Sequence, residues 1–200
     1  MLRRLYRVAR DLAFRTFPDQ AFAINYYNRY RKMAQELGVP EAEHDRLFAA
    51  MIDRSAGKPS LQIGVRERKL APHWVSVDLY DKSPLIDFNY DVHDLPFSDA
   101  SFDFVACSAV LEHVEYPQKA IAELTRVLRP GGEIWIEVPM DQPYHPSPGD
   151  FWRVTHAGMR IWMKGIDEAA IGIVFMNESP IYNYVFFHGI KPSPGAAAST

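Results

Sequence analysis

Cysteine and long apolar runs are nearly absent from this 200-residue sequence, whose only thiol is that of Cys107. One cysteine excludes an internal disulfide framework, and it also excludes a metal site built on several thiolates. No apolar stretch approaches the roughly 20 residues that a membrane-spanning helix needs. Arginines interrupt the first residues before an apolar core develops, so we expect no secretory signal and a cytoplasmic location. Cys107 itself is expected to be a small buried apolar residue.

A strong charge of either sign is missing as well. The 22 basic and 25 acidic residues leave a formal net charge of only -3, which gives no indication of nucleic acid as a partner. The hydrophobic fraction of 48% instead indicates a folded globular protein. A chain of this length suffices for one domain with a substantial core.

The hydrophobic pattern changes once along the chain. Residues 1–56 carry apolar side chains at helical spacing in three stretches, which are separated at Pro18 and Pro40. We predict a helical extension over 1–56 packed on a core domain over 57–191, with a flexible tail at 192–200. The basic first helix has three readings: a structural cap on the core, a segment lying on an anionic membrane surface, or a cleaved organelle-targeting segment.

From residue 60 onward, short apolar runs alternate with turns and helices. The candidate strands cover residues 61–65, 74–79, 85–91, 102–107 and 133–138, followed by a final pair at 171–176 and 182–187. A helix from Pro117 to Leu128 separates the fourth strand from the fifth, and Thr155 caps another that runs to about Lys164. This alternation predicts an α/β, Rossmann-like, doubly wound and mostly parallel sheet with helices on both faces.

Small or acidic residues stand at or just past four consecutive strand ends. They are Gly64, Asp78, Asp91 and Ser108. Right-handed crossovers bring the ends of parallel strands, and any ligand site, to one edge of the sheet. Asp78 and Asp91 could each simply be turn residues that end a strand. The ordered set of four favours a ligand site at this edge.

The middle of the chain resembles the class I S-adenosylmethionine-dependent methyltransferase family, in its type 11-like branch. Residues 91–105 are similar to the family's acidic residue, Leu-Pro-Phe turn and fourth strand. Residues 111–114 and 126–132 then follow in the family's order. The resemblance covers roughly 61–139 and implies methyl transfer as the activity and S-adenosylmethionine as the cofactor.

The same resemblance implies a set of cofactor-binding residues. They are Gly64, Arg66, Asp78, Leu79, Asp91, Val92, His93 and Ser108. By this resemblance Gly64 would lie against the methionyl portion, and Asp78 would accept hydrogen bonds from the ribose hydroxyls. Asp91 would face the adenine amine, and Ser108 would lie near the reacting sulfonium.

The glycine-rich turn departs from the family pattern, because the second glycine of Gly-x-Gly is replaced by Arg66. Arg66 either crowds out the methionyl end or pairs its guanidinium with the cofactor's carboxylate. The alternative to an enzyme is therefore a non-catalytic binding or scaffold protein of the same fold. A dehydrogenase is disfavoured, since no Gly-x-Gly-x-x-Gly follows the first strand.

The loop after the fifth expected strand, residues 144–156, concentrates aromatic and titratable side chains. The candidates for a base or an acceptor-orienting group are His145, Asp150, Arg153 and His156. Alternatively, Phe151 and Trp152 anchor the loop to the core while the rest is solvated. We read His113 as mainly structural, because its motif occurs in the family whatever the substrate.

The acceptor is expected to be a small molecule or a sugar-type compound, because the substrate loop is short and no added domain is evident. No metal-ligand spacing appears, so no metal is expected. The identity of the acceptor does not follow from the fold.

Overall fold

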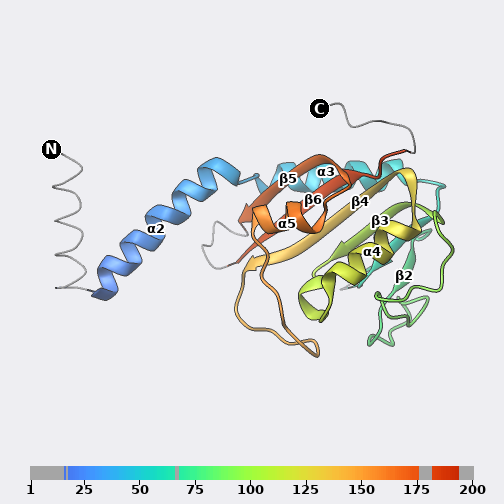
Figure 1. Ribbon diagram of the computed structural model, residues 1–200, viewed down its shortest axis with the longest axis horizontal. Coiled ribbons are helices and arrows are strands. Elements are labelled where there is room, and N and C mark those ends of the chain that lie inside the picture. Colours follow the sequence, from blue (N-terminus) through green and yellow to red (C-terminus); the bar gives the residue numbers. More distant parts are fainter. Residues whose placement is uncertain (1–15, 17, 66–67, 176–181, 194–200) are drawn as a thin grey trace. The chain divides into compact units, whose positions relative to one another are not determined.

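The computed structural model describes residues 16, 18–65, 68–175 and 182–193 of the chain. The chain divides into two compact units, Met1–Gly38 and Val39–Thr200. In the first unit, the described helix is α2 (Pro18–Leu37), which confirms the second of the expected amino-terminal helices (Figure 1). The basic first stretch lies outside the described residues, and packing of the first unit on the core stays a prediction. Within the described part of the chain, no helix is both long enough and apolar enough to cross a membrane.

Helix α3 (Glu41–Arg54) belongs to the second unit. Met51 on its inner face is fully buried in a cluster that includes Trp135 of the sheet. Burial of apolar area of this kind is the main favourable contribution to packing a helix on a sheet. The structural boundary therefore lies at Gly38 rather than after residue 56 as expected from the sequence, because the third helical stretch is part of the core.

The second unit is built on a sheet of six strands in the order β2-β1-β3-β4-β6-β5. The strands are β1 (Ser60–Ile63), β2 (Val75–Val77), β3 (Phe102–Ser108), β4 (Leu128–Asp141), β5 (Asp167–Phe175) and β6 (Asn183–Ile190). Neighbouring strands from β2 to β4 pair in parallel, whereas β6 is antiparallel to both β4 and β5. The expected α/β sheet and its final strand pair are thus confirmed.

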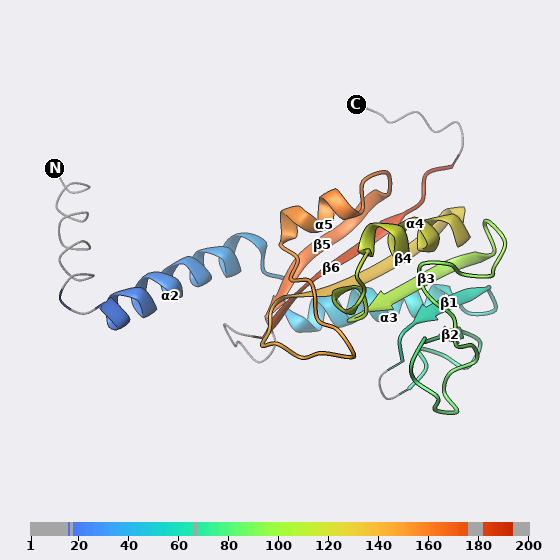
Figure 2. The same cartoon turned by 60° about the horizontal axis from the view of Figure 1, so that its bottom comes forward.

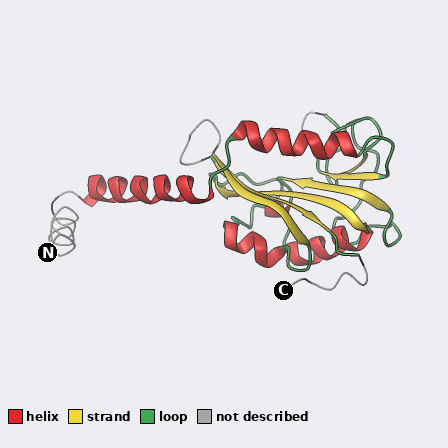
Figure 3. Ribbon diagram, turned by 90° about the horizontal axis from the view of Figure 1, so that it is seen from above, coloured by secondary structure: helices red, strands yellow, loops and turns green. Residues whose placement is uncertain are grey.

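Helices cover both faces of this sheet, as expected. Helix α3 lies on one face, while α4 (Pro117–Val127) and α5 (His156–Trp162) lie on the other (Figures 2 and 3). Pro117 occupies the first turn of α4, where its missing N–H has no helical partner to lose. Thr155 caps α5, since its hydroxyl accepts a hydrogen bond from the Gly158 amide at 3.1 Å.

The strand expected at residues 85–91 does not form. A single parallel bridge joins Val77 to Phe88, and the rest of the segment is irregular. The physical reason is that side chains replace the ladder: one carboxylate oxygen of Asp87 accepts hydrogen bonds from both the amide (2.8 Å) and the hydroxyl (3.0 Å) of Ser76. The segment is thereby fixed beside β2 without regular strand pairing.

Cys107 is fully buried in β3, and burial raises the pKa of its thiol. The expectation of a small buried residue is confirmed, and the thiol is held in its protonated, unreactive form at neutral pH.

Candidate functional site

A cleft of about 1000 Å³ opens at the carboxyl ends of β1, β2 and β3. Gly64 directly follows β1, Asp78 directly follows β2, and Ser108 is the last residue of β3. All three line the cleft. The edge predicted from the strand ends is therefore the edge at which the structure has its cleft.

The backbone at Gly64 requires glycine. Its φ of +75° lies in the left-handed region, and a Cβ at this position would overlap Cγ2 of Val110. The Gly64 amide donates to Val77 O at 2.9 Å, so the turn is tied to β2. The result is a stretch of exposed backbone at the floor of the cleft, with no side chain to keep a ligand away.

The two carboxylate oxygens of Asp78 differ in their contacts. Its Oδ1 accepts hydrogen bonds from the amides of Tyr80 (2.8 Å) and Asp81 (2.9 Å), which fixes the loop after β2. No hydrogen bond from a described residue reaches the second oxygen, Oδ2, so that oxygen is available to a ligand. Leu79 lies beside it and is 39% exposed along the cleft.

Asp91 and His93 form a pair on the same wall of the cleft. Asp91 Oδ1 accepts from the His93 amide (2.8 Å) and from His93 Nδ1 (2.7 Å). Although burial alone would raise it, these hydrogen bonds hold the pKa of the Asp91 carboxyl below its ordinary value. His93 Nε2 is buried and has no hydrogen-bond partner among the described residues. Val92, next to them, is buried and completes this wall.

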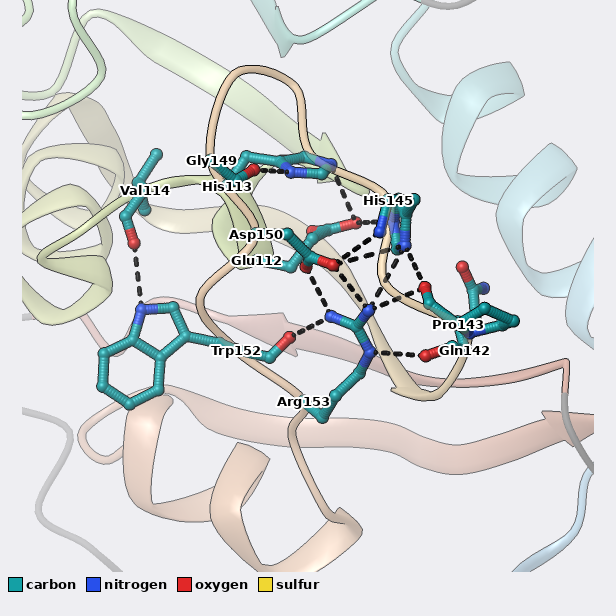
Figure 4. Close-up of polar contacts among 10 residues, drawn as sticks. All are labelled: Glu112, His113, Val114, Gln142, Pro143, His145, Gly149, Asp150, Trp152 and Arg153. Carbon is teal, nitrogen blue, oxygen red and sulfur yellow. Dashed lines mark hydrogen bonds and ion pairs between the residues drawn. The ribbon is translucent and has the colours of Figure 1, made fainter.

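The loop after β4 forms the opposite wall. His145, Ser147, Pro148, Gly149 and Phe151 of this loop line the cleft. Two hydrogen bonds fix this loop to the segment after β3. The Phe151 amide donates to Glu112 O at 2.7 Å. The Trp152 indole donates to Val114 O at 2.9 Å (Figure 4). Trp152 therefore anchors the loop as expected, whereas the Phe151 ring is 54% exposed.

An ion pair between Asp150 and Arg153 braces this loop from inside (Figure 4). The guanidinium donates to both carboxylate oxygens, at 2.6 and 2.8 Å, and it also binds the carbonyls of Gln142 and Pro143. These hydrogen bonds hold the pKa of Asp150 far below its ordinary value, and its side chain is only 1% exposed. Asp150 also accepts a hydrogen bond from the His145 amide at 2.8 Å. Asp150 and Arg153 therefore position His145.

Comparison with known proteins shows which proteins this chain resembles in sequence and in fold. Residues 71–136 match the family model described as a methyltransferase domain. Over 95 residues the chain is 38% identical to a demethylmenaquinone methyltransferase of Clavibacter sepedonicus, an alignment that covers 48% of this chain and 35% of that protein. The matched segment is thus similar to methyltransferase domains, and the two alignments extend that similarity over about half of the chain.

Further relatives agree with this assignment of the methyltransferase domain. A protein of Mycolicibacterium smegmatis named as a probable S-adenosylmethionine-dependent methyltransferase is 28% identical over 121 residues, covering 52% of this chain and 47% of that protein. The N-methyltransferase NodS of Bradyrhizobium japonicum, solved in complex with S-adenosyl-L-homocysteine, superposes with a TM-score of 0.59 at 16% identity. That alignment covers 84% of this chain and all of NodS, and it shows the shared fold. The chain spans between about a third and a half of the two curated relatives' length.

Two of the predicted site residues, Arg66 and His156, are not among the described residues that line the cleft. His156 begins α5, outside the lining of the cleft, and burial and then Arg160 lower its pKa. Arg66 lies outside the described residues, so its predicted contact with the cofactor stays a prediction. Of the three residues expected to be catalytic, His145 lines the cleft, and neither Asp150 nor His156 does.

Two residues of the methyltransferase domain matter more than their sequence suggested. Glu112 and His113, in the short helix η1 (Leu111–His113), line the cleft beside His145. The Glu112 side chain is completely buried, which is costly for a carboxylate unless its surroundings stabilise the charge. The signal in the sequence was a carboxylate and an imidazole, Glu112 and His113, a few residues after the end of β3. The sequence analysis attributed both to the family motif at residues 111–114 and assigned neither a role in the site.

Proposed function

We propose that the chain transfers a methyl group from S-adenosylmethionine to a small-molecule acceptor. One observation carries the proposal: glycine backbone, a free carboxylate oxygen and an aromatic nitrogen line one wall of a cleft whose other wall carries His145. The match of residues 71–136 to the methyltransferase-domain model supports the same reaction.

The residues present fit this cofactor. Gly64 lines the cleft with backbone and no side chain, which is suited to close approach of the methionyl portion. Oδ2 of Asp78 is suited to accept from ribose hydroxyls, because a carboxylate oxygen accepts more than one donor. His93 Nε2, a buried atom without a partner among the described residues, is suited to a polar edge of the adenine.

The cofactor supplies an electrophilic methyl group, and the chain supplies position and exclusion of water. Gly64 and Asp78 would fix the donor, and Ser108, which also lines the cleft, would lie near the reacting sulfonium. At the acceptor end, His113 and His145 are the side chains suited to interact with a nucleophilic oxygen, nitrogen or sulfur. The loop brace of Asp150 and Arg153 keeps this end rigid, so that the acceptor is held in line for attack.

A small acceptor suits this cleft better than a folded macromolecule. The exposed rings of Tyr80, Tyr116 and Phe151 line it and favour a flat or apolar molecule. Relatives named as demethylmenaquinone methyltransferases are consistent with an acceptor of this kind. A sugar-type acceptor and contact with a membrane surface stay predictions from the sequence.

A non-catalytic scaffold of the same fold is less favoured. The motive for it was Arg66, whereas the described residues Gly64, Asp78 and His93 that line the cleft suit the cofactor. Replacing the arginine in Arg66→Gly separates the two roles of the guanidinium. Loss of affinity for S-adenosylhomocysteine is expected if the guanidinium pairs with the cofactor's carboxylate, and a gain from no binding would mean that it blocks the site.

Thermal unfolding with S-adenosylhomocysteine tests the proposal. A ligand that binds only the folded state at about 100 times its Kd stabilises it by roughly 2.7 kcal/mol, which raises Tm by about 5 to 10 °C in a domain of this size. We expect this shift in the native chain and in Asp53→Ala, an exposed acidic residue of α3. We expect none in Asp78→Ala. No shift in the native chain at millimolar ligand would contradict the proposal.

A further inference from the structure

Three potential metal ligands meet at the acceptor end of the cleft. Glu112 and His113 come from η1, and His145 comes from the loop after β4 (Figure 4). One ligand atom from each side chain lies within 4.8 Å of the others. Residues of two segments, separated by more than thirty positions in the sequence, therefore bring two imidazoles and a carboxylate to one point.

Hydrogen bonds determine which nitrogen of each imidazole carries the proton. His113 Nδ1 lies 2.6 Å from Gly149 O, and His145 Nδ1 lies 2.7 Å from Pro143 O. A carbonyl oxygen only accepts, so each Nδ1 must be the protonated nitrogen. Arg153 Nη2 also lies 3.3 Å from His145 Nδ1. A guanidinium only donates, so this longer contact is not a hydrogen bond when Nδ1 is protonated, and the shorter contact with Pro143 O decides the assignment.

The other nitrogen of each ring, Nε2, consequently presents a lone pair in the neutral imidazole. The two Nε2 atoms lie 3.7 Å (His113) and 3.9 Å (His145) from Oε1 of Glu112. These separations are too long for hydrogen bonds, which need about 2.7 to 3.2 Å. The lone pairs of both Nε2 atoms therefore lie close to one buried carboxylate oxygen, Oε1 of Glu112. A positive ion between these three atoms would stabilise the arrangement.

The surroundings of the three side chains match those of known metal ligands. A metal-binding histidine commonly donates its second ring N–H to a backbone carbonyl, which fixes the tautomer and the orientation of the ring. Both histidines do so here. Asp150 further holds the His145 backbone amide, and Arg153 is already committed to Asp150 through two hydrogen bonds.

We propose that Glu112, His113 and His145 bind a divalent transition-metal ion of the zinc class. Two imidazoles and one carboxylate are a donor set that zinc and iron(II) take in catalytic sites, with at least one position left open. Bonds of about 2.0 to 2.2 Å would require the ligands to approach one another by up to about 1 Å. With 39% of its side chain exposed, His145 is the most accessible of the three ligands. This proposal reverses the expectation of no metal drawn from the sequence.

The open position faces the cleft, where it would bind the nucleophilic atom of the acceptor; this role rests on the proposed methyl transfer, whereas metal binding does not. A metal-bound hydroxyl or thiol releases its proton to water more readily. The lone pair left on the acceptor atom then forms a bond to the methyl carbon. The bond from that carbon to the sulfonium sulfur breaks, and its electron pair returns to sulfur.

Cobalt(II) titration of the untagged, chelator-treated chain tests the site. We expect one equivalent to bind, with visible d–d absorption of a four- or five-coordinate ion, and we expect zinc to displace it. His145→Ala and His113→Ala should each weaken binding by more than about tenfold, since even residues that only orient a ligand contribute that much. His73→Ala is the matched control, because His73 is exposed and does not line the cleft.

Stoichiometric cobalt binding that both cleft variants weaken, and that His73→Ala does not, supports the site. Absence of stoichiometric binding, or binding indifferent to His113→Ala and His145→Ala, overturns it. A cooperative thermal unfolding transition without ligand, measured on the same samples, shows that each variant is folded, and the Tm shift on adding S-adenosylhomocysteine then reports cofactor binding. The two measurements together separate the two proposals. Cobalt binding without binding of S-adenosylhomocysteine supports the metal site and contradicts the methyl transfer. Binding of S-adenosylhomocysteine without cobalt binding contradicts the metal site alone.

Discussion

At the scale of single residues, Gly64 sets the shape of the cleft floor. Its left-handed φ and the overlap that a Cβ would make with Val110 are separate obstacles to any other residue. The sequence predicted a role for this glycine from its place after a strand. It could not predict Val110 as the neighbour, because the two residues meet only once the strands are paired.

Replacing this glycine should therefore be costly in two ways. We expect Gly64→Ala to lower the free energy of unfolding by about 1 to 2 kcal/mol from the backbone alone, with a further loss from the overlap. Urea unfolding measures both. In the double variant Gly64→Ala/Val110→Ala the overlap is relieved and the backbone cost remains, so partial recovery is expected. Equal stability of Gly64→Ala and the native chain would contradict this description of the turn.

Asp150 shows that a titratable side chain in a loop beside the cleft can serve to hold the loop, because it is paired with Arg153. The sequence singled out His145, Asp150 and His156 on residue type and position alone. Chain packing then separated them, because Arg153 binds Asp150 on both oxygens while His145 is left at the cleft. Glu112 was overlooked, since neither its complete burial nor its approach to two imidazoles is visible in the sequence.

Breaking this pair should destabilise the fold while the cofactor wall remains intact. We expect Asp150→Asn to cost about 2 kcal/mol, less than for a fully buried pair because the Arg153 side chain is 27% exposed. The double variant Asp150→Asn/Arg153→Met should recover part of that loss, which a double-mutant cycle in urea measures. Strictly additive losses would mean that the two side chains do not act as a pair.

At the scale of elements, Glu133 of β4 links a helix to the antiparallel half of the sheet. Its carboxylate accepts hydrogen bonds from Arg54 of α3, at 2.8 and 2.7 Å, and from His188 of β6, at 2.8 Å. Burial alone would raise its pKa, but these bonds outweigh burial and lower it to about 2. The structure thus joins three elements through one side chain.

The stability of the fold should depend on the charge of Glu133. A carboxyl whose pKa is lowered on folding contributes its full stability above its unfolded pKa of about 4.5, and the contribution is lost as the pH falls from there to about 2. Glu133→Gln should therefore cost about 2 kcal/mol at neutral pH, allowing for the partly exposed Arg54. The difference from the native chain should shrink below pH 4.5 in urea unfolding.

The matched control is Glu43→Gln, which removes an exposed carboxylate paired with Arg46 on the same helix. That variant should unfold with nearly the native midpoint at neutral pH, because exposed pairs contribute little. A difference between Glu133→Gln and the native chain that stays constant from pH 7 to pH 3 would show that the lost stability has another origin.

Helices and strands with a strong apolar periodicity could be predicted from the sequence. A segment fixed by hydrogen bonds from polar side chains, residues 85–91, could not. Helix α4 and strands β1, β3 and β4 follow from apolar spacing, because burial of one face dictates both spacing and position. Residues 85–91 have a similar apolar pattern, yet Asp87 binds Ser76 and replaces regular pairing. A contact between two polar side chains eleven residues apart leaves no periodic trace in the sequence.

At the scale of the whole molecule, the chain consists of two units, and the described cleft belongs to one of them. The described residues that line the cleft run from Ile63 to Phe151. The sequence predicted an amino-terminal extension, but it placed the boundary after residue 56 because it could not tell a helix that packs on the sheet from one that does not. The packing of α3 on the sheet resolves this point.

Removal of the first unit should leave cofactor binding unchanged. A chain that begins at Val39 retains the described lining of the cleft, so we expect its affinity for S-adenosylhomocysteine to match that of the full chain. Isothermal titration calorimetry on both proteins measures the affinity. A marked loss in the shortened chain, with its fold intact by circular dichroism, would assign residues 1–38 a part in the site.

The central claim is that S-adenosylmethionine binds along the edge formed by Gly64, Asp78 and the Asp91–His93 pair. Amide hydrogen exchange with and without saturating S-adenosylhomocysteine tests it most directly, because ligand contact slows local opening. We predict increased protection at residues 63–65, 77–81, 91–93 and 108–110, and none in α5 beyond the general stabilisation. Protection confined to other segments, or no change anywhere at a concentration that should saturate the site, would contradict the account.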